Sequence, residues 1–216
     1  MITAILGVMC FGVADALWRP NVLRYGYLKV LLHRTLLTTV LLAGFFFLNY
    51  NNQNYDLSII CVAILSGVIA GAGLYFLVKA FQFESTANIL FLNIITLLVS
   101  QLSSLLLFDD SVDWPQYLTQ ISLSVFAVSC FNQFKLKIRK GLQFGVLACI
   151  CFGVAYPLAG IPIDSIGYSA TIFCQELVIL CGFMLFCYCR WSHSVVLNVW
   201  FRFAGAEQSF RKSSNA

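Results

Sequence analysis

The sequence predicts an all-α, polytopic helical membrane protein with about seven transmembrane helices, and its composition gives the first reason. Of its 216 residues, 60% are hydrophobic and only 10% are charged, and the mean hydropathy is +0.86. A soluble domain is usually about 45–50% apolar and about 25% charged, so these charges are too few to cover a soluble globule. The second reason is that the apolar residues form continuous runs near the ~20 residues that a helix needs to cross a bilayer.

Seven such runs follow one another along the chain. We expect transmembrane helices at 2–23, 30–48, 57–80, 86–108, 116–134, 141–162 and 166–189. The runs do not alternate between apolar and polar residues, so they lack the pattern of a transmembrane β-barrel. The connections between them are short. In the third run, the small residues Gly67 and Gly71 are four positions apart, which predicts a close helix–helix contact.

The charged residues sort onto alternate connections, and this predicts an orientation. All thirteen basic residues lie on one set: Arg19, Arg24, Lys29, Arg34, Lys79, Lys135, Lys137, Arg139, Lys140, Arg190, Arg202, Arg211 and Lys212. The other set carries acidic residues and no basic ones: Asp56, Asp109, Asp110, Asp113 and Asp164. By the positive-inside rule, the C-terminal tail is cytoplasmic and the N-terminus lies outside the cell (inner) membrane. Because the basic residues form no single patch, we expect no nucleic-acid partner.

The nine cysteines do not indicate a metal or redox site. They lie inside apolar stretches, with no C-x-x-C motif and no paired histidine, so we interpret them as small packing residues. We therefore expect no metal and no cofactor. A Walker-type Gly-x-x-x-x-Gly-Lys motif is also missing from the sequence, which gives no support to ATP-driven pumping.

An internal repeat at a shift of 141 residues is the most informative feature. Cys10–Ala14 and Cys151–Ala155 share the sequence CFGVA, and Gly26-Tyr27 recurs as Gly167-Tyr168. Ten positions between 6 and 36 are identical to their counterparts. Chance similarity between apolar helices does not readily extend to a matching Gly-Tyr at the start of the next helix.

The repeat predicts the organisation of the chain. Residues 1–140 form a first five-helix repeat, 141–189 form the first two helices of an incomplete second repeat, and 190–216 form a cytoplasmic tail. Because five is an odd number of spans, the two copies insert with opposite orientations. Such inverted repeats are typical of secondary transporters, whose substrate site lies near the midplane between the repeats.

Five stretches of the chain resemble the EamA-like branch of the drug/metabolite transporter superfamily. They are the Gly-containing first helix that ends near Trp18, Arg34 at the start of the second helix, the aromatic-rich ending at 73–81, the turn at 84–87 and the acidic turn at 109–114. The resemblance covers about residues 4–189. It implies ten helices in two five-helix repeats. Three helices are then missing: either the chain is a fragment, or a second copy or a partner chain supplies them.

Two carboxylates inside predicted helices are candidates for substrate or proton binding. Asp15 is midway along the first helix, and Glu176 is in the first half of the seventh. Ionisable groups cost roughly 2.5–3.5 kcal/mol at the centre of a membrane helix on insertion scales, and they usually face the bundle interior. Asp15 is also loosely similar to the acidic residue in the first helix of the small multidrug resistance family. The alternatives are an Asp15–Arg19 ion pair along the helix and, for Glu176, a hydrogen bond to a neighbouring helix.

Arg34 is the third candidate, near the cytoplasmic end of the second helix. Its guanidinium group could grip an anionic substrate through its fork of donors. It could equally extend to the membrane interface, as basic residues near helix ends commonly do. The repeat aligns Arg34 with Gln175.

Three prolines are expected to break the repeat-related first and sixth helices: Pro20, Pro157 and Pro162. Interrupted helices build the sites of many transporters. Trp18 and Tyr156 lie close to these prolines, and the repeat aligns Tyr156 with Asp15. They are candidate walls of a cavity, with ordinary packing as the alternative.

These features together favour a secondary transporter that moves small metabolites or drugs by alternating access, with proton coupling through a carboxylate. The expected partners are the lipid bilayer and a small-molecule substrate. A seven-helix retinal receptor would need a lysine in its last helix, and 166–189 contains none. An enzyme is not expected, because His-Glu-x-x-His and Gly-x-Ser-x-Gly motifs are both missing from the sequence. A non-transporting or partner-dependent membrane subunit remains an alternative.

Overall fold

The structure is a computed structural model that describes residues 17–48, 56–108, 118, 121–122 and 140–189. These residues are helical and contain no strand, which confirms the predicted all-α class. The chain divides into two units, Met1–Leu180 and Cys181–Ala216. The described part of the second unit is the end of the last helix.

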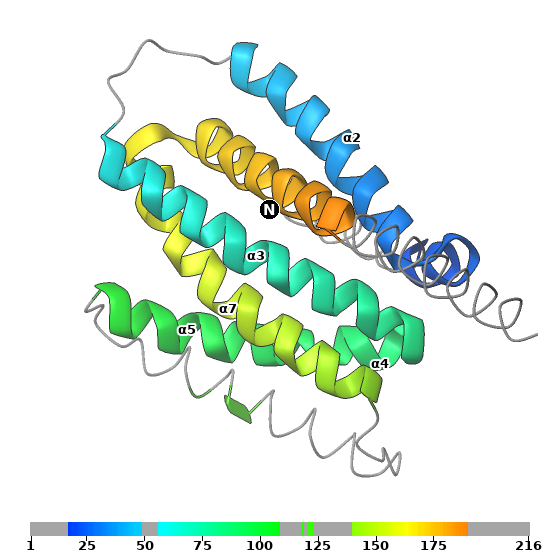
Figure 1. Cartoon of the computed structure of the whole chain (residues 1–216). Coiled ribbons are helices and arrows are strands. Elements are labelled where there is room, and N and C mark those ends of the chain that lie inside the picture. The colour runs from blue at the N-terminus through cyan, green and yellow to red at the C-terminus, as the bar shows by residue number, and fades with distance from the viewer. Residues whose placement is uncertain (1–16, 49–55, 109–117, 119–120, 123–139, 190–216) are drawn as a thin grey trace, which may run out of the picture. The chain divides into compact units, whose positions relative to one another are not determined.

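Figure 1 shows the described helices. In chain order they are a segment at 17–25, α2 (Tyr27–Leu48), α3 (Leu57–Phe83), α4 (Thr86–Phe91), α5 (Asn93–Phe108), α7 (Lys140–Ile166) and the last helix (Tyr168–Cys189). Among the described residues, α2, α3, α7 and the last helix are long and apolar enough to cross a membrane. The predicted helix at 116–134 and most of the one at 2–23 lie outside the described residues, so the count of seven stays a prediction.

The predicted single helix at 86–108 is wrong, because the chain turns at Leu92 between α4 and α5. Short hydrogen bonds form the turn: Leu92 N donates to Ile89 O at 3.0 Å, and Ile95 N donates to Leu92 O at 2.8 Å. The Cys149 thiol donates a further bond to Leu92 O at 3.1 Å. Leu92 itself is buried in the core. Tertiary packing therefore stabilises a break that the apolar sequence alone does not reveal.

The predicted breaks at Pro157 and Pro162 are also absent, because α7 runs through both prolines. A proline inside a helix removes one backbone hydrogen bond and its ring crowds the preceding turn. Both prolines are buried in α7, so packing against neighbouring helices holds the helix together on both sides of them. Pro20 likewise lies within the helical segment 17–25.

The core forms where α7 packs against α3 and α5. Figure 1 shows α3 and α7 running in opposite directions, whereas α5 and α7 run the same way. Small residues bring the helices close: a Cβ built on Gly153 would lie 2.5 Å from Val99 Cβ, and one on Gly73 would lie 3.0 Å from Cys151 Cβ. The buried cluster consists of Ala80, Phe81, Ile89, Leu92, Leu142 and Cys149.

Large apolar side chains cover much of the outer surface. On α2 the exposed ones include Leu37, Val40, Leu41, Phe45 and Phe47. Contiguous apolar surface of this kind is rare on soluble monomers, because each buried Å² of apolar area is worth about 25 cal/mol in water. Together with the four long apolar helices, this surface indicates a membrane-embedded protein.

Candidate functional site

Two glycine junctions start the helices that carry the candidate side chains. Gly26 has φ 81° and precedes α2, and Gly167 has φ 85° and precedes the last helix. This left-handed conformation is favourable for glycine and costly for other residues. Gly26 N donates to Val22 O at 2.9 Å, and Gly167 N donates to Ile163 O at 3.0 Å. Each glycine thus ends one helix and changes the direction of the chain, and the next helix begins directly after it.

The structure joins two of the predicted site residues in an ion pair. Arg34 Nη1 of α2 lies 2.7 Å from both Oε1 and Oε2 of Glu176 in the last helix. The two residues are 142 positions apart in the sequence. The Glu176 side chain is 10% exposed and that of Arg34 is 33% exposed. Figure 1 shows α2 and residues 168–180 running in opposite directions.

Two threonines of α2 complete the polar surroundings of Glu176. The Thr38 hydroxyl lies 3.1 Å from Oε2 of Glu176, and the Thr39 hydroxyl lies 3.3 Å from its backbone oxygen. Both hydroxyls also reach carbonyl oxygens of their own helix: Thr38 reaches Arg34 O at 2.8 Å and Thr39 reaches Thr35 O at 2.7 Å. If Glu176 separates from these threonines, each hydroxyl can therefore still donate to a backbone oxygen of α2.

A second polar contact fixes the helix that carries Glu176 against α3. The Gln175 side-chain amide donates to the Ser66 hydroxyl at 2.7 Å, and both residues are buried. At the next position, a Cβ built on Gly67 would lie 3.0 Å from Gln175 Cα. A Cβ on Gly71 would lie 3.3 Å from Ile179 Cγ1. The close contact predicted from Gly67 and Gly71 is confirmed, and it holds Glu176 in register with α2.

The other site candidates that the structure describes make different contacts. Asp15 lies outside the described residues. Trp18 packs against the core cluster around Phe81. Tyr156 is exposed on α7, and its ring stacks on Phe152 at 5.8 Å between centroids. Arg19 donates from Nε to the backbone oxygen of Glu84 at 2.9 Å.

Sequence reasoning missed the residues that support the pair. A signal was present, because Thr38 follows Arg34 by four positions within an apolar run. Residues three and four apart share a helix face, so the Thr38 hydroxyl belongs to the face that carries Arg34, whereas Thr35 and Thr39 share a neighbouring face. The Ser66–Gln175 contact had no comparable signal, since its partners are 109 positions apart.

The arrangement suits a site where Arg34 exchanges Glu176 for another anion, and it does not suggest metal binding. In the described residues, no group of three His, Cys, Asp or Glu side chains could hold a metal ion. Arg34 uses only Nη1 toward Glu176, and the described residues provide no acceptor for its Nε and Nη2. A guanidinium group has five donors in a planar fork. The third of the Arg34 side chain that is exposed leaves room for a second acceptor.

The fold and the pair together define a class of protein: a membrane-embedded helical protein with an ion pair between two of its apolar helices. Comparison with protein-family models, with curated proteins and with solved structures gives no match. The resemblance to EamA-like transporters therefore rests on the residues of this sequence alone.

Proposed function

We propose that this chain is a secondary transporter that moves a small metabolite or drug across the membrane by alternating access. The observation that carries the proposal is the Arg34–Glu176 ion pair between α2 and the last helix. Charged residues within transmembrane helices are costly, and they mark substrate paths and proton relays. A purely structural pair would be a weak stabiliser in such a position, because desolvation offsets its attraction.

The relation between the two helices supports the same function. The 141-residue repeat aligns α2 with the last helix at both ends, Tyr27 with Tyr168 and Leu48 with Cys189. The preceding glycines have the same left-handed conformation. The pair thus joins repeat counterparts that run in opposite directions (Figure 1). Inverted repeats place substrate and coupling-ion sites at the interface between their halves.

The chemistry of the pair favours an anionic substrate coupled to a proton. An incoming carboxylate or phosphate competes with Glu176 for Arg34, whose Nε and Nη2 have no acceptor among the described residues. Separation from Arg34 would leave the Glu176 carboxylate buried without its cation, which is costly, so we propose that a proton from the gradient then neutralises it. The Thr38 hydroxyl then donates its hydrogen bond to the backbone oxygen of Arg34 and no longer to Glu176. Release of the substrate restores the ion pair and expels the proton.

Transport in proteoliposomes tests this proposal. The full chain is reconstituted, a proton gradient is imposed, and the vesicles receive a defined mixture of carboxylic acids, phosphate esters and amino acids. Mass spectrometry then measures which compounds accumulate in the lumen. We expect accumulation of an anionic compound that collapses when an ionophore removes the gradient. Arg34→Gln and Glu176→Gln should each abolish it.

Matched controls separate the pair from charge loss in general. Arg24 is exposed on segment 17–25, and Asp164 is exposed in the last turn of α7. Arg24→Gln and Asp164→Asn should therefore transport as the wild type does. The proposal fails if the wild-type chain accumulates no compound, or if Arg34→Gln and Glu176→Gln match their controls.

A further inference from the structure

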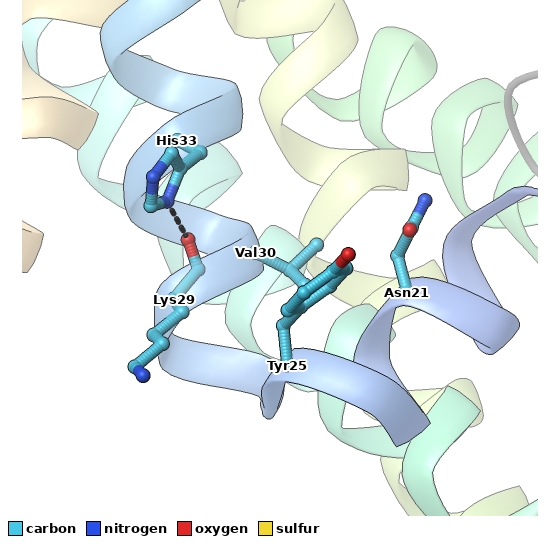
Figure 2. Close-up of a pocket in the computed structure, with 5 residues that line it drawn as sticks. All are labelled: Asn21, Tyr25, Lys29, Val30 and His33. Carbon is cyan, nitrogen blue, oxygen red and sulfur yellow. Dashed lines mark hydrogen bonds between the residues drawn. The ribbon is translucent and has the colours of Figure 1, made fainter.

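A cavity with a largely apolar lining lies where segment 17–25 meets α2, apart from the ion pair. It has a volume of about 330 Å³ and is lined by Asn21, Tyr25, Lys29, Val30 and His33 (Figure 2). This volume is within the range of small-molecule sites. We propose that the cavity binds a phosphate group, and that an anionic membrane lipid supplies it.

The hydrogen-bonding groups of the lining suit a phosphate oxygen. His33 Nδ1 donates to the backbone oxygen of Lys29 at 2.7 Å (Figure 2), so Nε2 of the neutral ring is an acceptor that suits a headgroup hydroxyl beside the phosphate. The Asn21 amide donates to Leu17 O at 2.9 Å, and its second N–H remains available to a ligand. Lys29 extends from α2 at the edge of the cavity, on a flexible stem whose ammonium group can turn toward a phosphate.

The charge around the cavity is positive. None of the described lining residues is acidic. Lys29 has no ion-pair partner within the described ranges, whereas Arg34 is held by Glu176. The guanidinium group of Arg24 lies 5.1 Å from the centre of the Tyr25 ring and adds a second cation beside the cavity. A phosphate in the cavity would therefore meet the ammonium group of Lys29, and Arg24 beside Tyr25 adds positive charge nearby.

The surroundings favour a lipid over a soluble phosphate ester. The Val30 side chain and the Tyr25 ring make part of the lining apolar, and Leu23 on the same helical segment as Tyr25 is exposed. The charge pattern places this connection on the cytoplasmic face. Basic pockets between transmembrane helices on that face bind anionic headgroups. The headgroup would occupy the cavity, and the acyl chains would lie along the apolar surface of α2.

Native mass spectrometry of the full chain tests the proposal. The protein is released from detergent micelles that contain phosphatidylglycerol or, in a separate arm, phosphatidylcholine, and lipid adducts are counted. We expect adducts with phosphatidylglycerol only. Lys29→Gln should weaken binding about fivefold, because one basic residue near an anionic membrane surface contributes on the order of that factor. Lys29→Arg should retain the adduct.

Lys140→Gln is the matched control, because Lys140 is an exposed lysine at the start of α7 and is not among the described residues that line the cavity. It should bind phosphatidylglycerol as the wild type does. If Lys29→Gln and Lys140→Gln bind the same amount of phosphatidylglycerol, the proposed lipid site is wrong. Displacement of the lipid by an equal concentration of glycerol 3-phosphate would overturn the lipid source and assign the cavity to a soluble phosphate ester. Unchanged thermal unfolding of each variant shows that folding does not cause the difference.

Discussion

Because Glu176 is more buried than Arg34, losing one partner of the ion pair costs a different free energy from losing the other. Loss of Arg34 would leave the Glu176 carboxylate, which is only 10% exposed, with Thr38 as its described side-chain donor. Loss of Glu176 would leave a guanidinium group that is 33% exposed. The long arginine side chain can then extend toward water. The carboxylate therefore depends on Arg34 more than Arg34 depends on the carboxylate.

We accordingly predict an asymmetric response to neutralisation. Arg34→Gln should lower the free energy of unfolding by about 3 kcal/mol, near the lower end for a broken buried pair. Glu176→Gln should lower it by about 1 kcal/mol, since the amide still accepts a hydrogen bond. Equilibrium unfolding in mixed micelles of a mild detergent and dodecyl sulfate measures both values.

The double variant Arg34→Gln/Glu176→Gln should lose less than the sum of the single losses, because no unpaired charge remains. Arg24→Gln, at an exposed position, should change the stability by less than about 0.5 kcal/mol. Equal losses in the two single variants, or additive losses in the double variant, would argue against the asymmetry.

Part of this site could be predicted from the sequence. Arg34 and Glu176 are polar groups inside apolar segments, and the cost of such groups in a membrane singles them out. Their pairing could not be predicted, because it depends on how helices 142 positions apart pack together. Asp15 was selected by the same rule and lies outside the described residues, so its role stays a prediction.

At the scale of helices, glycine determines how closely α7 approaches α5. A Cβ built on Gly153 would lie 2.5 Å from Val99 Cβ and 3.0 Å from the backbone nitrogen of Ser100. A side chain there would push two backbones apart, and no flexible group could absorb the clash. Gly44, near the C-terminal end of α2, offers the opposite case, with no atom within 4 Å of its Cβ position.

These two glycines make a matched test of helix packing. Gly153→Ala should destabilise the protein by about 1–3 kcal/mol, as overpacking of a core commonly does. Gly44→Ala should stabilise it by about 0.5–1 kcal/mol, because alanine restricts the unfolded chain and favours the helix. Thermal unfolding in detergent gives the two signs, and destabilisation by both variants to the same extent would contradict the proposed contact.

The two glycine junctions lead to a prediction about the repeat. Gly26 and Gly167 both have positive φ, and no atom lies within 4 Å of either Cβ position. Substitution by alanine should therefore cost only the backbone strain, about 1–2 kcal/mol at each site. Asparagine, which tolerates this conformation better, should cost less at both. Unfolding measurements that give clearly different costs at the two sites would argue against equivalent junctions.

Helix existence was easier to predict than helix interruption. The hydrophobic runs place α3 and the last helix within a few residues of their bounds in the structure, because the bilayer length fixes how long an apolar run must be. The turn at Leu92 and the continuity through Pro157 and Pro162 were not predicted. Both depend on tertiary contacts, such as the Cys149 bond to Leu92 O, that no local pattern contains.

At the scale of the whole molecule, the charges and the repeat predict the same orientation of the helices in the membrane. The basic residues alternate with the acidic ones from connection to connection, so the positive-inside rule predicts the first and third loops on one side of the membrane and the second loop on the other. A five-span repeat inverts its second copy. Both rules therefore predict that α2 and the last helix cross the membrane in opposite directions. Figure 1 shows α2 and residues 168–180 running in opposite directions, which agrees with this prediction.

Reporter fusions test this orientation directly. The chain is truncated after Asp56, Glu84, Lys140 or Asp164 and joined to alkaline phosphatase, which is active only outside the cytoplasm, or to green fluorescent protein, which fluoresces only inside. In a bacterial host we expect phosphatase activity after Asp56 and Asp164, because acidic loops without lysine or arginine are translocated. We expect fluorescence after Glu84 and Lys140, next to the retained basic residues. Reversal of all four readings would invert the orientation and keep the repeat, whereas Asp56 and Asp164 on opposite sides would contradict the inverted repeat itself.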